Sequence, residues 1–135
     1  LKMDNYKPKI LIIDDDIDLV EVLRITLENE NYEVIDAQTG LRGYNLAQTM
    51  NPNLIILDVM MGTIDEGFHT AYQIRANPET KETPIIMLTA VVQQTGFKFS
   101  KDDDEAFLPV DEFIEKPVNP KKLIDTVRKL LVPVK

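Results

Sequence analysis

The chain has 135 residues, 44% of them hydrophobic, which is enough for one globular domain with a full core and too few for two. Its formal net charge of −8 at pH 7 argues against unspecific nucleic-acid binding, because that binding depends mainly on lysine and arginine side chains that neutralise phosphates. The sequence has no cysteine, no apolar run of about 18 residues and no signal-peptide pattern, so we expect a cytoplasmic protein that does not enter a membrane.

The chain begins with a predicted tail and a buried strand. We expect residues 1–8 to be an N-terminal tail, whose first two residues look like a cloning remainder before a methionine, and residues 9–135 to form the domain. Residues 10–13 are all isoleucine or leucine, which is typical of a strand buried on both faces. A helix over residues 17–30 follows, with Val20, Leu23 and Leu27 at helical spacing.

A second strand and a second helix come next. Residues 32–37 are predicted as a short strand and residues 39–50 as a helix that the segment Asn51-Pro52-Asn53 ends. One face of this helix carries small side chains, so we expect it to pack closely on the sheet. That face holds Gly40, Gly43, Tyr44 and Ala47.

The second half of the chain continues the alternation. A strand is predicted over residues 54–58, and a helix from about residue 67 to residue 76, with Phe68, Ala71 and Ile74 facing inward. The stretch 77–84 is rich in turn-forming residues and leads to a strand over residues 85–88.

The C-terminal part of the chain adds a last strand and a last helix. The strand is predicted over residues 112–114, and Asn119-Pro120 signals a helix start, because asparagine caps well and proline fits the first helical position. The buried face of that helix holds Leu123, Val127, Leu130 and Leu131. Five strand and helix units in alternation predict an α/β fold, a doubly wound five-stranded parallel sheet with helices on both faces.

Acidic residues follow two of the buried strands. The first strand stops at Asp14, Asp15 and Asp16, and the third ends in Asp58. Carboxylates gathered at one edge of a sheet cannot all stay ionised without a cation, and Mg²⁺ prefers oxygen ligands of this kind. The triplet taken alone could equally be a solvated turn that caps the next helix. The second acid-terminated strand favours a shared magnesium pocket.

With Thr89-Ala90 after the fourth strand and Lys116-Pro117 after the fifth, these acids resemble the receiver domain of two-component response regulators, a CheY-like domain. The resemblance covers about residues 9–131 and implies the strand order 2-1-3-4-5. It implies that Asp58 accepts a phosphoryl group from a sensor histidine kinase or a histidine phosphotransfer protein. It also implies a signalling domain rather than an enzyme, with only self-phosphorylation and autodephosphorylation. Such a domain would change conformation and signal by protein contact, as a monomer or a phosphorylation-dependent dimer, without binding nucleic acid directly.

The same resemblance assigns roles to the remaining site residues. Mg²⁺ would be held directly by Asp15, Asp58 and the backbone carbonyl of Met60, and through water by Asp14. Thr89 and Lys116 would contact the phosphoryl group, Phe113 would be the aromatic switch residue, and the Lys116–Pro117 peptide bond would be cis. The downstream partner and the cognate kinase are not indicated.

The chemistry of the residues supports these roles independently. Attack of a carboxylate on phosphorus brings negative charges together, and a divalent cation and a lysine offset them. A lysine before proline is more often a surface residue, but Lys116 ends an apolar strand opposite an acidic pocket. Thr89 alone would be a simple strand residue, and beside Asp58 its hydroxyl becomes a donor to a phosphoryl oxygen. His69 is expected on the surface, outside the site.

Two segments depart from the family pattern. The family usually reads D-x-x-M-P-x-x-D-G from the acceptor, whereas this chain has Gly62 for the proline and one residue more before Gly67, so we expect a more mobile loop. Residues 91–110 are longer than the family norm and lack the pattern of its fourth helix. We expect an extended stretch around residues 97–99 and a short helix from near Ser100, together forming the signalling surface.

Other classes of protein fit the sequence less well. A degenerate receiver that serves only as a docking module would not need the complete set of acids, threonine and lysine. An aspartyl-phosphate phosphatase of the haloacid dehalogenase type needs a second aspartate two residues after the first, where this chain has Met60. A flavodoxin-type FMN binder needs a phosphate cradle where Asp14 to Asp16 would repel the ligand.

Overall fold

The computed structural model describes residues 6–59, 64–89 and 110–131. The predictions for residues 1–5, for Met60 and its loop, and for almost all of the 91–110 segment therefore lie outside the described residues. Within the described ranges, no helix is both long enough and apolar enough to cross a bilayer.

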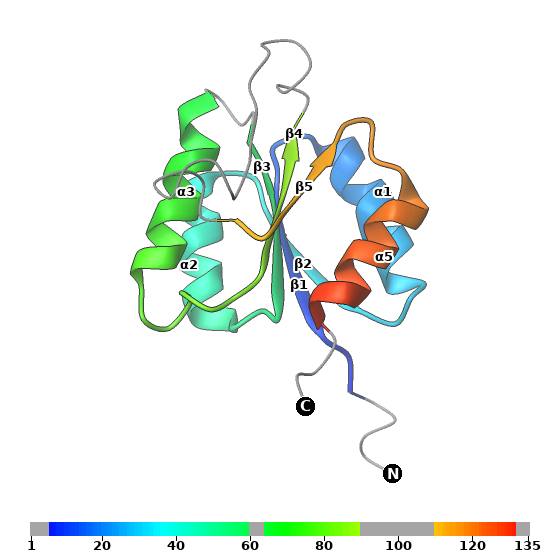
Figure 1. The fold of residues 1–135 in the computed structure, drawn as a ribbon, viewed down its shortest axis with the longest axis horizontal. Coiled ribbons are helices and arrows are strands. Elements are labelled where there is room, and N and C mark those ends of the chain that lie inside the picture. The colour runs from blue at the N-terminus through cyan, green and yellow to red at the C-terminus, as the bar shows by residue number, and fades with distance from the viewer. Residues whose placement is uncertain (1–5, 60–63, 90–109, 132–135) are drawn as a thin grey trace.

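The chain forms a five-stranded parallel sheet in the order β2-β1-β3-β4-β5, as predicted. The strands are β1 Lys9–Ile13, β2 Glu33–Ala37, β3 Leu54–Asp58, β4 Ile85–Thr89 and β5 Glu112–Glu115. The described helices are α1 Ile17–Glu28, α2 Gly40–Met50, α3 Ile64–Ala76 and α5 Pro120–Leu131. Helices α2 and α3 cover one face of the sheet, and α1 and α5 cover the other (Figure 1).

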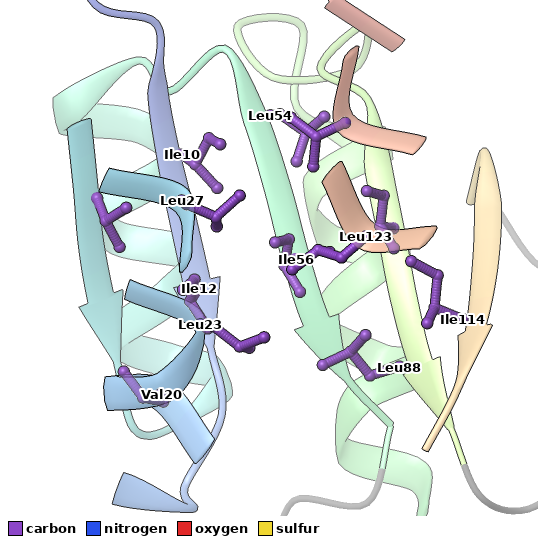
Figure 2. Packing of buried hydrophobic residues seen from close by; sticks show 13 residues of the cluster. Ile10, Ile12, Val20, Leu23, Leu27, Leu54, Ile56, Leu88, Ile114 and Leu123 are labelled. Carbon is purple, nitrogen blue, oxygen red and sulfur yellow. The ribbon is translucent and has the colours of Figure 1, made fainter. Parts of the chain in front are cut away.

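Each face of the sheet has its own hydrophobic core, because side chains alternate along a strand. Ile10 and Ile12 of β1 point toward α1 and α5, where Leu23 and Leu123 meet them (Figure 2). The other face packs residues of β1, β3 and β4 against α2 and α3. The central strands β3 and β4 are buried along their whole length, as expected for parallel strands with helices on both sides.

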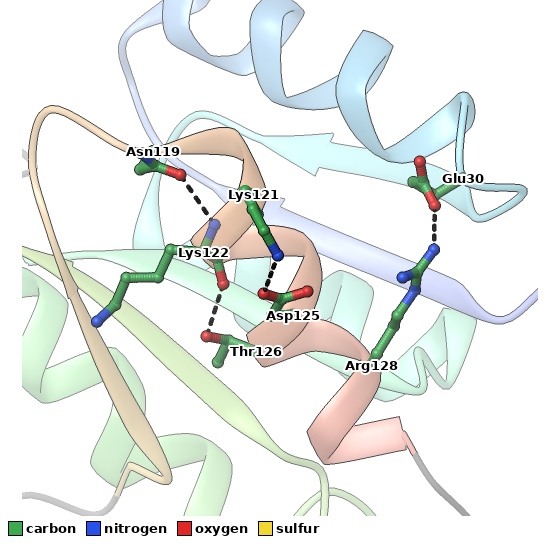
Figure 3. Close-up of polar contacts among 7 residues, drawn as sticks. All are labelled: Glu30, Asn119, Lys121, Lys122, Asp125, Thr126 and Arg128. Carbon is green, nitrogen blue, oxygen red and sulfur yellow. Dashed lines mark hydrogen bonds and ion pairs between the residues drawn. The ribbon is translucent and has the colours of Figure 1, made fainter.

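Three helix starts carry side-chain caps, of which those at Asp16 and Asn119 were suggested by the sequence. The Asp16 carboxylate accepts a hydrogen bond from Leu19 N, and the Thr39 hydroxyl accepts one from Arg42 N. Asn119 Oδ1 accepts a hydrogen bond from Lys122 N at 3.0 Å, and Pro120 is the first residue of α5 (Figure 3). These bonds satisfy backbone N–H groups that have no partner within a helix.

Arg128 of α5 forms an ion pair with Glu30, which lies just after α1 (Figure 3). This contact joins the two helices that cover the same face of the sheet. It lies near the C-terminal end of α5, whereas Asn119 fixes the helix start. Both ends of α5 are therefore held in place.

Some predicted boundaries are wrong by a few residues. Helix α3 begins at Ile64 instead of about residue 67, so Gly67 lies inside the helix, where it packs against β3. Helix α1 ends at Glu28 instead of residue 30, and Asn31 adopts a left-handed φ of 72° in the turn to β2. Gly43 does pack on the sheet, against Ile13, but Gly40 faces α3.

Candidate functional site

The site lies at the carboxyl ends of the strands, where the loops leave the sheet. Asp14 follows β1 and Asp58 is the last residue of β3, and these two strands are neighbours with Ile13 paired to Leu57. Both carboxylates are buried, whereas Asp15 is exposed. Carboxylate oxygens of the three residues lie within 4.8 Å of one another. The sequence prediction that Asp14, Asp15 and Asp58 share one pocket is therefore confirmed in position.

Lys116 brings a positive charge into this pocket. It follows β5, and its backbone N–H donates to the carbonyl of Thr89 at 2.9 Å. Its Nζ lies 3.1 Å from Asp58 Oδ1 and 4.0 Å from Asp14 Oδ2. The Lys116–Pro117 peptide bond is cis, as predicted. The lysine thus reaches over β4 to the two buried acids.

The two oxygens of the Asp14 carboxylate have different surroundings. Asp14 Oδ1 accepts a hydrogen bond from Asp16 N at 2.9 Å. Asp14 Oδ2 is buried and has no hydrogen-bond partner among the described residues. Burial raises the pKa of Asp14 from 3.8 to about 7, the bond from Asp16 N works against this rise, and the neighbouring Asp58 carboxylate adds to it.

These residues fit a small divalent cation. Three carboxylates and one ammonium give the pocket a formal excess of negative charge when the acids are ionised. Each acid offers a carboxylate oxygen, the ligand type that Mg²⁺ prefers. Asp14 Oδ2, which has no hydrogen-bond partner among the described residues, is a buried acceptor that a metal ion or one of its waters would satisfy.

The remaining predicted site residues lie in different parts of the structure. Thr89 is buried at the end of β4, between the strands that carry Asp58 and Lys116. Phe113 is half-buried in β5 and packs against the core on the α2 and α3 side. His69 is exposed on α3, as expected. The Met60 carbonyl, predicted as a metal ligand, lies outside the described residues.

The three acids of the triplet lie in different surroundings. Asp14 is buried in the pocket, Asp15 lies at its exposed side, and Asp16 caps α1 through its hydrogen bond from Leu19 N. The helix-cap interpretation thus holds for Asp16, whereas Asp14 and Asp15 stay candidates for the metal pocket.

The sequence pattern of the response regulator receiver domain matches residues 10–128. The chain belongs to this family. The receiver domain is a signalling module of two-component systems, and its five-stranded sheet with the order 2-1-3-4-5 is the CheY-like fold.

This receiver domain matches larger regulators over only part of their length. It is 36% identical over 124 residues to the DNA-binding dual master transcriptional regulator RpaA of Synechocystis sp., covering 92% of this chain and 49% of RpaA. It is also 36% identical over 127 residues to the transcriptional regulatory protein SrrA of Staphylococcus aureus, covering 91% of this chain and 47% of SrrA. The chain spans about half the length of these curated relatives.

Solved structures of receiver domains superpose on the chain closely. Chemotaxis protein CheY4 of Vibrio cholerae does so with a TM-score of 0.78 at 30% identity, covering 93% of this chain and 100% of that chain. The receiver domain of the sensor histidine kinase PA1611 from Pseudomonas aeruginosa, crystallised with a magnesium ion in its active-site cleft, has a TM-score of 0.79 and covers 93% and 98% of the two chains. Its sequence identity is 20%, so this second likeness concerns the fold alone.

Sequence reasoning missed two contacts that residues of α3 make. The Glu66 carboxylate accepts a hydrogen bond from Gly40 N of α2, and Gly67 packs against the backbone of Asp58 and Val59. Gly67 offered one signal, because a glycine can mark a place where backbones approach closely. The bond from Gly40 to Glu66 left no such signal, since it joins residues of two separate helices.

Proposed function

We propose that Asp58 is the phosphoryl acceptor of this receiver domain, and that it takes the group from a histidine kinase or a histidine phosphotransfer protein. The observation that carries the proposal is the 3.1 Å contact between Lys116 Nζ and the buried Asp58 Oδ1, beside two further carboxylates. A buried aspartate beside an ammonium group suits a nucleophile that must approach a negatively charged phosphoryl group.

The reaction follows from the charges in the pocket. An oxygen of the Asp58 carboxylate attacks phosphorus, the bond between phosphorus and the donor's imidazole nitrogen breaks, and an acyl phosphate forms on Asp58. The electron pair of the broken bond stays with the imidazole, which then takes up a proton. Lys116 offsets the negative charge that gathers on the phosphoryl oxygens. The hydroxyl of Thr89, at the end of the neighbouring strand, is the proposed donor to one of them.

The proposed metal ligands are Asp15, Asp58 and the Met60 carbonyl directly, with Asp14 acting through water. Bound Mg²⁺ would supply positive charge next to the phosphoryl oxygens. The protein's own contribution is the fixed arrangement of buried oxygens around Asp58, held by hydrogen bonds such as that from Asp16 N to Asp14.

The proposal extends to the partners of the domain. Asp15 is exposed beside the buried Asp58, so a donor can approach the pocket from solvent on that side. Phe113 is proposed to act as the switch residue that transmits phosphorylation from the site. The downstream partner is a protein that recognises the phosphorylated state, and a DNA-binding output like that named for RpaA would belong to a longer protein.

The test is direct labelling of Asp58. The protein is incubated with phosphoramidate or acetyl phosphate and Mg²⁺, and its intact mass is measured. We expect one added phosphoryl group, lost in Asp58→Asn and in EDTA. Asp18→Asn is the matched control, because Asp18 is an exposed acid in the first turn of α1 and should leave labelling unchanged.

The labelling experiment, together with the response to beryllofluoride, distinguishes a phosphoryl acceptor from a docking module. A degenerate receiver would bind a partner without taking up phosphate and would not respond to beryllofluoride, a phosphoryl analogue. Labelling that survives Asp58→Asn would place the acceptor elsewhere and overturn the proposal.

A further inference from the structure

The first turn of α2 is capped from two directions. Thr39, the residue before α2, accepts a hydrogen bond from Arg42 N at 3.1 Å. The N–H of Gly40 donates instead to Glu66 Oε2, at 3.0 Å, and Glu66 belongs to α3. Helix α2 has no acidic residue in its own first turn. The negative charge that favours the start of α2 therefore comes from a neighbouring helix.

Helices α2 and α3 leave no space between them at this point. A Cβ atom on Gly40 would lie 2.2 Å from Thr70 Oγ1 and 3.4 Å from Glu66 Oε2. Thr70 also donates a hydrogen bond to the carbonyl of Glu66 at 3.0 Å. The start of α2 is thus packed closely against α3 at Glu66 and Thr70.

The residue after Glu66 contacts the backbone that carries Asp58. A Cβ atom on Gly67 would lie 2.7 Å from the carbonyl oxygen of Asp58 and 2.6 Å from Val59 Cα. Only a glycine allows α3 to approach the end of β3 so closely. A shift of Glu66 would therefore be passed through one peptide unit to the main chain of Asp58.

We infer that Glu66 is a positioning residue for Asp58, acting through its bond from Gly40 and through the Gly67 contact. The inference rests on the proposed role of Asp58 as phosphoryl acceptor. Glu66 ties α3 to the capped start of α2, and α3 in turn packs against the end of β3. The Asp58 carboxylate then keeps its 3.1 Å contact with Lys116 when a phosphoryl group arrives.

The experiment compares two variants that each remove one acceptor from the start of α2. Glu66→Ala and Thr39→Ala both leave one N–H of α2 without its partner, but only Glu66 is the chain neighbour of Gly67, which packs against the backbone of Asp58. The rate of Asp58 labelling by phosphoramidate is measured at saturating Mg²⁺ and phosphodonor, and unfolding by urea is measured alongside. We expect Glu66→Ala to slow labelling by about threefold or more, since small misplacements of a reacting group have large effects on rate. Thr39→Ala should lower stability to a similar degree and leave the labelling rate unchanged.

Two further variants complete the test. Glu66→Gln keeps an oxygen that can accept a hydrogen bond from Gly40 N, so this variant should be labelled at the wild-type rate. Glu66→Asp keeps the charge but is one methylene shorter, so it should label slowly, and it serves in place of the alanine variant if that variant does not fold. Equal labelling rates for Glu66→Ala and Thr39→Ala would contradict the inference, because Glu66 would then act only as a helix cap. Absence of labelling in the wild-type protein would instead overturn the role of Asp58 itself, so the two failures are distinguishable.

Discussion

Asp14 is an acid that the folded protein holds at a cost in stability. Its side chain is fully buried, one of its oxygens has no hydrogen-bond partner among the described residues, and burial raises its pKa to about 7. Below pH 3.8 the folded and unfolded states both hold the Asp14 proton. Between about pH 4 and pH 7 the folded state holds it and the unfolded state does not, so the free energy of unfolding falls as the pH rises.

We therefore predict that Asp14→Asn stabilises the metal-free protein at pH 8, by about 1–3 kcal/mol, because asparagine removes the buried charge. The gain should shrink toward pH 4, where Asp14 is already protonated. Urea unfolding in EDTA at several pH values measures both effects. Asp18→Asn, which changes an exposed acid, is the control and should give no gain. A gain that does not depend on pH would mean that the charge of Asp14 is not its cause.

Lys116 is the cation that faces both buried acids. We predict that Lys116→Met, which keeps the length of the side chain and removes its charge, slows Asp58 labelling by about 10- to 100-fold, since fixed charges at a reacting centre contribute strongly to rate. Labelling by phosphoramidate, followed by intact mass, measures the effect. Lys121→Met is the matched control, because Lys121 is 84% exposed and forms its ion pair with Asp125 on the surface of α5. Equal rates for the two variants would remove Lys116 from the site.

Two glycines allow helices to approach the sheet, and they differ in what they touch. A Cβ on Gly67 would meet the backbone of Asp58 and Val59, whereas a Cβ on Gly43 would meet the side chain of Ile13. An added Cβ should therefore displace the main chain of Asp58 at Gly67, but only the side chain of Ile13 at Gly43.

We predict that Gly67→Ala and Gly43→Ala each lower the free energy of unfolding by about 1–3 kcal/mol, as overpacking usually does. Only Gly67→Ala should also slow Asp58 labelling, because it displaces the main chain of the acceptor. Urea unfolding and labelling rates, measured on both variants, test this. If Gly43→Ala impairs labelling as strongly as Gly67→Ala, the contact between α3 and β3 has no special role.

At the level of helices and strands, the sequence predicted element types better than contacts between elements. The five strands and the parallel order follow from short apolar runs that alternate with helical patterns, and both are confirmed. The start of α3 was placed three residues late, because Gly67 reads as a helix boundary when its contact with β3 is unknown. Arg75 of α3 pairs with Asp111 at 2.7 Å, and no local pattern indicates a pair formed between residues so far apart in the chain.

The site was predictable for a reason that concerns the whole sheet. In a parallel sheet all strands end at the same edge, so residues that follow different strands come together without any local signal linking them. The shared edge brings Asp14, Asp58 and Lys116 close together, as predicted. The bond from Gly40 to Glu66 was not predictable, because it depends on how two helices lie side by side on that sheet.

At the scale of the whole molecule, the proposed metal site should couple Mg²⁺ binding to folding. An ion that binds only the folded state raises the free energy of unfolding, by about 2.7 kcal/mol at one hundred times its dissociation constant. For a domain of this size we expect the melting temperature to rise by roughly 5–12 °C. The rise should be larger at pH 8 than at pH 6, because burial raises the pKa of Asp14 to about 7 and a proton held there opposes the cation.

Thermal unfolding with MgCl₂, compared with KCl at the same ionic strength, measures this coupling. Asp15→Asn and Asp58→Asn should each reduce the rise, since each removes an oxygen ligand from the cluster, and Asp18→Asn should keep it. General screening of the charge of −8 would behave differently, because the loss of any single acid would then change the rise to a similar small extent. An equal increase in melting temperature in all three variants would therefore contradict a specific site. An increase that depends on Asp15 and Asp58 would link the stability of the whole domain to the pocket around the acceptor.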